Sequence, residues 1–276
     1  MGQARPSLHE RGRTRVAVLV AALLLAGCGG GDPEATDRDR PTASRSAETT
    51  SAPPAVVAPP APTPTVEPGG TDAAGLVVPA ETAGDLDSRS VPQAPDLGAG
   101  WTRYVDPGDV AEGYTGNGSW VRARGAAEVV QSVVPLGCTG LTSVPRLPVP
   151  RHALEATYRG PRDAPGVALV LEYRDRGEAA AFVAGMARIA RSCPEPEGGV
   201  RPDDPFTVVI EPLRVSDRVV LDRRREHGAG AGEWLWSEAV VREGDRVGLL
   251  ILASPPSGPR PDLTLLSQRL RAAVPR

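Results

Sequence analysis

Alternating apolar and polar residues dominate the second half of the chain, and a period of two is typical of half-buried strands. A turn rich in Gly and Pro at 160–166 separates two such segments, and Glu243-Gly244-Asp245 joins the last two. Because strands joined by short turns pair antiparallel, these segments predict an antiparallel sheet. The predicted strands are 119–124, 152–159, 167–173, 206–213, 217–225, 234–242 and 246–253.

Three other segments carry apolar residues at steps of three and four, the spacing of a helix with one buried side. The clearest is 178–193, in which Phe182, Met186 and Ile189 share a side, and the others are 126–136 and 261–274. Strands and helices in separate blocks favour the α+β class. We predict a curved antiparallel sheet of about six or seven strands with two or three helices packed on one face.

The N-terminus follows a different pattern. A basic start leads into an unbroken apolar run at 16–26, which ends in Leu25-Ala26-Gly27-Cys28. This is the layout of a secretory signal peptide, and its end resembles the lipobox of bacterial lipoproteins, in which the cysteine carries diacylglycerol. As a helix the run is roughly 16 Å long, whereas a membrane-spanning helix needs about 20 residues. We predict a signal peptide at 1–27, lipidation at Cys28 and export to the outer face of the cell membrane; cleavage to a soluble secreted protein is the alternative.

Residues 28–93 are rich in Pro, Ala, Thr, Ser and Gly and contain no aromatic residue. Such a segment buries too little apolar surface to offset its chain entropy. We predict a disordered linker that holds the domain away from the membrane, and unselected low-complexity sequence is the alternative. The folded domain is expected at 94–276, which is long enough for one hydrophobic core.

Lipidation of Cys28 leaves Cys138 and Cys193, an even number in an oxidising compartment. We predict a disulfide between them that joins the ends of two helices and stabilises the fold by roughly 4 kcal/mol; two separately buried thiols are the alternative. The chain has only three histidines and no C-x-x-C motif. We therefore expect no metal site and no cofactor.

The charge distribution and the missing motifs exclude several function classes. All 31 basic residues are arginine, and the net charge is −3. An acidic chain without a basic cluster argues against nucleic acid as a partner, and the absence of lysine excludes a P-loop and Schiff-base chemistry. No G-x-S-x-G motif is present, and Glu233 and Glu238 fall on opposite faces of a strand. We predict that the protein is not an enzyme and has no catalytic residues.

Two weak patterns indicate a binding cleft. Trp234 and Trp236 lie two apart on a predicted strand and so share a face, and a basic run that includes Arg223 and Arg225 lies on the preceding strand. The alternatives are that the tryptophans fill the core and the arginines form a solvated face. As a cleft, these four residues would bind a small ligand, a lipid or a cell-wall component.

The order of these features resembles a known family. A lipobox and a Pro/Thr-rich spacer precede a Gly-x-Gly-Trp segment at 98–101, and a helix beginning Glu-Ala-Ala-Ala-Phe ends at Cys193. This order is similar to that of the extracellular sensor-like domains of actinobacterial lipoproteins and to the sensor domain of the mycobacterial receptor kinase PknH. The resemblance implies a curved sheet with helices, a cleft, disulfides and a non-catalytic sensor role. The chain has no kinase domain, so signalling would need a separate protein partner. A lipid or glycolipid carrier and a cell-wall hydrolase or its accessory protein are the alternatives.

Overall fold

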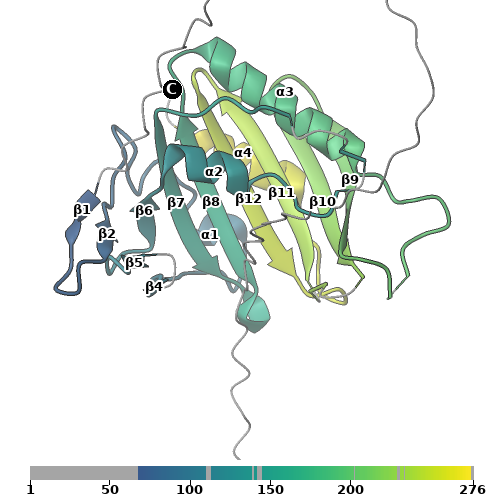
Figure 1. Ribbon diagram of the computed structural model, residues 1–276, viewed down its shortest axis with the longest axis horizontal. Coiled ribbons are helices and arrows are strands. Elements are labelled where there is room, and N and C mark those ends of the chain that lie inside the picture. The colour runs from purple at the N-terminus through teal and green to yellow at the C-terminus, as the bar shows by residue number, and fades with distance from the viewer. Residues whose placement is uncertain are drawn as a thin grey trace, which may run out of the picture. The chain divides into compact units, whose positions relative to one another are not determined.

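An eight-stranded antiparallel sheet forms the centre of the fold (Figure 1). The structure, a computed structural model, describes residues 68–274 except 110–112, 139, 142–144, 202, 229–230 and 233. The predicted signal peptide, the Cys28 lipidation site and residues 29–67 lie outside the described residues. In the sheet the order is β3-β7-β8-β12-β11-β10-β9, and β6 also pairs with β7. The strand bounds are β3 Thr102–Arg103, β6 Val121–Ala123, β7 His152–Arg159, β8 Pro165–Glu172, β9 Thr207–Val215, β10 Val219–His227, β11 Leu235–Glu243 and β12 Arg246–Ser254.

The predicted α+β class and the predicted antiparallel sheet are confirmed. Each segment that alternates in the sequence forms a strand, with ends that differ by a few residues. The helices also follow their apolar spacing. The longer two begin at aspartate caps: Asp175 accepts hydrogen bonds from Gly177 and Glu178, and Asp262 from Thr264 and Leu265. Their bounds are α1 Ala94–Leu97, α2 Ala126–Ser132, α3 Arg176–Ser192 and α4 Leu263–Ala273.

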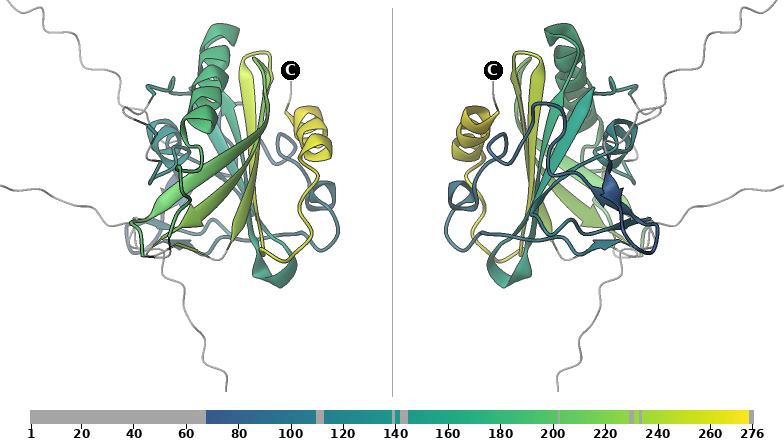
Figure 2. Two further views of the ribbon diagram at one scale, coloured as in Figure 1. Left: turned by 90° about the vertical axis from the view of Figure 1, so that its right-hand side faces the viewer. Right: turned by 90° about the vertical axis from the view of Figure 1, so that its left-hand side faces the viewer.

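The helices cover both faces of the sheet, so their predicted placement on one face was wrong (Figure 2). Helices α2 and α3 pack on one face, and α1 and α4 pack on the other. The reason lies in the strands, whose central parts are apolar on both sides. On β10, for example, Val219 and Leu221 belong to the core under α4, and Val220 belongs to the core under α3. A sheet with two apolar faces must be covered twice to keep both from water.

A glycine in a central strand lets α4 lie close to the sheet. A Cβ atom on Gly248 of β12 would lie 2.7 Å from Cγ2 of Val274 and 3.0 Å from Leu270. These are distances that ordinary side-chain packing does not reach. The missing side chain therefore sets the separation between helix and sheet.

The folded region begins before the predicted boundary at Ala94. Residues 68–93, which composition assigns to the linker, are built into the same unit. They contain β1 Pro68–Thr71 and β2 Val77–Pro79, which join β4 Gly108–Asp109 and β5 Tyr114–Thr115 in a second sheet of order β1-β2-β5-β4. Leu86 and Val91 are 0% and 1% exposed in the core on the α4 side. A few well-placed apolar side chains thus anchor a segment whose average composition favours disorder.

The predicted disulfide is confirmed. Cys138 follows α2 and Cys193 ends α3, and their sulfur atoms are bonded across a sequence separation of 55 residues. Cys193 is 1% exposed within the core on the α3 side. The bond therefore ties the chain after α2 to the end of α3. Among the described helices, none has the length and apolar character needed to cross a membrane.

Candidate functional site

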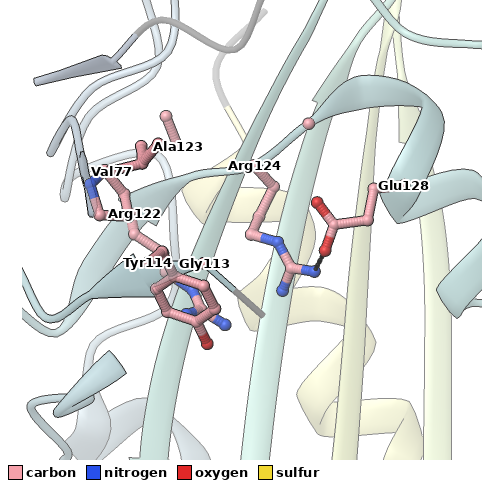
Figure 3. Close-up of a pocket in the computed structure, with 9 residues that line it drawn as sticks. Val77, Gly113, Tyr114, Arg122, Ala123, Arg124 and Glu128 are labelled. Atoms are coloured by element: carbon pink, nitrogen blue, oxygen red, sulfur yellow. Dashed lines mark hydrogen bonds and ion pairs between the residues drawn. The ribbon is translucent and has the colours of Figure 1, made fainter. Parts of the chain in front are cut away.

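A pocket of about 420 Å³ lies where the small sheet meets β6 at the edge of the large sheet (Figure 3). Apolar side chains from β2 form one part of its wall, and charged side chains from β6 and α2 form another. A second pocket, of about 440 Å³, lies beside Trp101, but its charged residues Arg162, in a short 3-10 helix, and Arg260, on a loop, are exposed. The first pocket is therefore the better candidate site. Its walls include Val77, Pro79, Tyr114, Arg122, Arg124 and Glu128.

Two arginines in the wall are fixed by one buried glutamate. Arg122 and Arg124 lie two apart at the end of β6, so both extend to the same face of the sheet. Glu155 of β7 is opposite Arg122 in the strand register. One oxygen of Glu155 lies 2.6 Å from a terminal nitrogen of Arg122, and its other oxygen lies 2.5 Å from Arg124. The Glu155 side chain is 7% exposed, so the pair of strands holds this carboxylate away from water.

Further contacts complete the arginine environment. Asp106 lies 2.8 Å from Arg122, and the Tyr114 ring lies 4.6 Å from the guanidinium carbon of the same residue. Glu128, one turn into α2, forms an ion pair with Arg124 at the pocket wall (Figure 3). Arg122 is thus enclosed by two acids and an aromatic ring, a strong environment for a cation.

These contacts keep both arginines charged. Burial opposes the charge on Arg122, but Glu155, Tyr114 and Asp106 outweigh it and raise the pKa of Arg122. Burial also opposes the charge on Arg124, and Glu155 and Glu128 outweigh it, so the pKa of Arg124 is raised despite the nearby Arg122. The pocket therefore presents two oriented guanidinium groups, which are paired with Glu155, Asp106 and Glu128, beside an apolar surface. Such a site can orient a small polar ligand.

The predicted cleft residues do not come together. Trp236 lies on the α3 side of the sheet, opposite Arg224, whereas Arg223 and Arg225 lie on the α4 side. Trp234 comes just before β11 and is half-buried, and Arg225 is exposed. The reason is that side chains alternate between the two faces of a strand. Arg224, which lies between the two predicted arginines, therefore shares a face with Trp236, and Arg223 and Arg225 do not.

The same strands contain a buried acid pair that sequence reasoning missed. Asp222 and Glu238 lie directly opposite each other on β10 and β11 and are 3% and 1% exposed. Arg224 donates a hydrogen bond of 2.6 Å to Glu238. Burial and the charge of Glu238 raise the pKa of Asp222, and burial also raises the pKa of Glu238, which Arg224 partly offsets. The sequence signal was a carboxylate on an otherwise buried stretch of each strand, but only the register joins the two.

Comparisons with known proteins give a distant likeness to a solved structure. No protein-family model and no curated protein matches the chain. A solved structure, the extracellular domain of PknH from Mycobacterium tuberculosis, is similar with a TM-score of 0.40 and 12% identity. The likeness covers 68% of this chain and 91% of that one. At that distance we base no argument about function on it. Within the described residues, no group of three or more His, Cys, Asp or Glu side chains could hold a metal ion.

Proposed function

We propose that this chain is an exported lipoprotein, anchored through diacylglycerol at Cys28, whose folded domain is a non-catalytic, sensor-like ligand-binding module. The pocket beside β6 is the ligand site in this proposal. The basic, apolar and Leu-Ala-Gly-Cys pattern at the N-terminus supports export and anchoring. In this arrangement, residues 29–67 connect the anchor to the folded domain.

The observation that carries the binding role is the pocket with two fixed guanidinium groups. Its volume of about 420 Å³ falls in the range of small-molecule sites. Arg122 and Arg124 are 13% and 16% exposed in their side chains and are oriented by Glu155 rather than by solvent. Preorganised charge next to an apolar wall is the usual composition of such sites.

Two features of the site favour binding over the alternative functions. A lipid carrier would enclose acyl chains in an apolar cavity, whereas three charged side chains, Arg122, Arg124 and Glu128, line this pocket. A glycosidase needs two carboxyl groups that a sugar can reach. The two acids that face each other, Asp222 and Glu238, are almost fully buried and do not line the pocket.

The anchoring part of the proposal is tested by membrane fractionation. In the full chain, Cys28→Ser removes the thiol that would accept diacylglycerol. We expect the wild type in the membrane fraction and the variant in the soluble fraction or uncleaved. A variant that is cleaved and still bound to membranes would contradict lipid anchoring.

The binding part is tested by filling the pocket. Val77→Trp places a large ring at the pocket wall, and Val78→Trp, one residue along the same strand, extends to the other side. The small-molecule fraction of a cell-envelope extract should raise the thermal unfolding temperature of the wild type and of Val78→Trp. It should have no effect on Val77→Trp. Equal stabilisation of both variants would contradict the assignment of the ligand to this pocket.

A further inference from the structure

Only some of the N–H donors of the Arg124 guanidinium are bonded within the protein. One of its terminal nitrogens contacts Glu155, and the other contacts Glu128. A guanidinium has five N–H donors, and the Arg124 guanidinium has no other partner among the described residues. Because Arg124 lines the pocket and is 16% exposed, its remaining donors form part of the binding surface.

The two carboxylates on Arg124 differ in how firmly they are held. Glu155 is 7% exposed and is shared with Arg122, so its removal would take the buried partner from two arginines at once. Glu128 is 57% exposed, and its pair with Arg124 is of the i,i+4 type at the protein surface. Water competes with Arg124 for this exposed carboxylate, which weakens the pair although Arg124 itself is only 16% exposed. Glu128 can therefore leave Arg124 at little cost.

Resting on the function proposed above, we infer that the ligand is a small monocarboxylate with an apolar body, and that its carboxylate takes the place of Glu128 on Arg124. The charges favour this class. With Glu128 displaced, Arg122 and Arg124 balance Glu155 and Asp106. A monoanion then restores the charge that Glu128 supplied, whereas a dianionic phosphate would add an excess charge beside buried carboxylates.

The rest of the wall fits the carbon part of such a molecule. Val77 and Pro79 of β2 line the pocket beside Arg124. These side chains offer apolar contact but no charge, so they distinguish an acid with a hydrocarbon body from a small inorganic anion.

The test compares phenylacetate with its uncharged analogue phenylacetamide by ligand-observed NMR titration of the full chain. Phenylacetate should bind the wild type, and phenylacetamide should bind about tenfold more weakly, because it cannot form a charge-assisted hydrogen bond. In Glu128→Gln the internal competitor is lost, and phenylacetate should bind about twofold more tightly. Val77→Trp should abolish binding of both probes.

The matched control is Glu178→Gln, which removes the acid of another i,i+4 pair, with Arg174, away from the pocket. It should leave the phenylacetate Kd unchanged. Arg124→Gln should abolish the preference for the acid; if that variant does not fold, the comparison of Glu128→Gln with Glu178→Gln decides alone. Equal affinity for acid and amide, no binding of phenylacetate at millimolar concentration, or equal affinities in the two glutamine variants would each overturn the inference.

The inferred carboxylate class can be wrong while the proposed ligand-binding function still holds. If phenylacetamide or the cation benzylamine binds in the pocket better than phenylacetate, the carboxylate class is wrong and the pocket is still a ligand site. If the envelope extract stabilises Val77→Trp as well as the wild type, the proposed binding role itself is wrong.

Discussion

Replacing Asp222 by Asn should stabilise this protein at neutral pH. The Asp222 side chain is 3% exposed, and its Oδ1 has no hydrogen-bond partner among the described residues. It lies opposite Glu238, and the ion-pair partner in this cluster, Arg224, contacts Glu238. Two carboxyl groups thus share one guanidinium. Asparagine has nearly the same size and can donate a hydrogen bond to the unpaired Oε1 of Glu238.

The expected gain is about 1–3 kcal/mol at pH 7, the usual cost of a buried polar group without a partner. This gain in stability increases with pH, which is unusual for the replacement of an acid. Below the unfolded pKa of about 3.9 the carboxyl is protonated in both states, so wild type and variant have similar stability. Because the pKa of Asp222 is raised in the folded state, the wild type loses stability as pH rises through that folded pKa. The Asp222→Asn variant does not lose this stability, so the difference in the free energy of unfolding between variant and wild type grows as pH rises.

Urea denaturation of the full chain between pH 4 and pH 8, followed by circular dichroism, measures this difference. One kcal/mol should also shift the thermal midpoint by about 2–4 °C for a domain of this size. Asp203→Asn, in an exposed turn, is the matched control for loss of one negative charge and should change the free energy of unfolding little at any pH.

A second variant should change the free energy of unfolding in the opposite direction. Glu238→Gln removes the carboxylate that Arg224 contacts at 2.6 Å, so a guanidinium that is 15% exposed loses its ion partner. We expect destabilisation at pH 7. If Asp222→Asn destabilises the protein at pH 7, or if its effect is the same at pH 4 and pH 8, then Asp222 is ionised and paired in the fold and the reasoning is refuted.

Four further variants test the fold and the site by denaturation under the same conditions. Cys138→Ser should cost about 4 kcal/mol by loss of the bond to Cys193, and a wild-type midpoint that is the same in reducing and oxidising buffer would contradict this. Gly248→Ala should cost about 1–3 kcal/mol because the added methyl group pushes α4 from the sheet; no loss would mean that the helix shifts freely. Glu155→Gln should cost about 3–5 kcal/mol because two arginines lose their shared partner, whereas Glu128→Gln should cost at most about 0.5 kcal/mol; equal losses would contradict the difference in burial.

Much of the main sheet could be predicted because the alternation of apolar and polar residues within each strand reflects which of its side chains are buried. The β7 strand, His152–Arg159, has the bounds that alternation predicts, and α3 follows the apolar stripe from Ala179 to Cys193. The short strands of the small sheet, such as Val77–Pro79, could not be predicted. They are too short to show a period, and their conformation depends on the pairing of β2 with β5.

The candidate site shows the same division between local pattern and tertiary contact. Arg122 and Arg124 could be placed on one side of a strand from their spacing. Their role could not, because Glu155 lies 31 residues beyond Arg124 and reaches it only when β6 pairs with β7. The predicted cleft failed for a related reason. The face of Trp236 depends on the register between β10 and β11, which no local pattern specifies.

The sequence by itself determined the periodic elements and the antiparallel class of the sheet, and it predicted the pairing of Cys138 with Cys193 and a lipoprotein-like N-terminus. These depend on patterns within short segments, or on the number and placement of the cysteines. Only the tertiary structure decided that helices cover both faces, that residues 68–93 belong to the domain and where charges become enclosed. Those features depend on contacts between residues far apart in the chain, which burial and strand register create together.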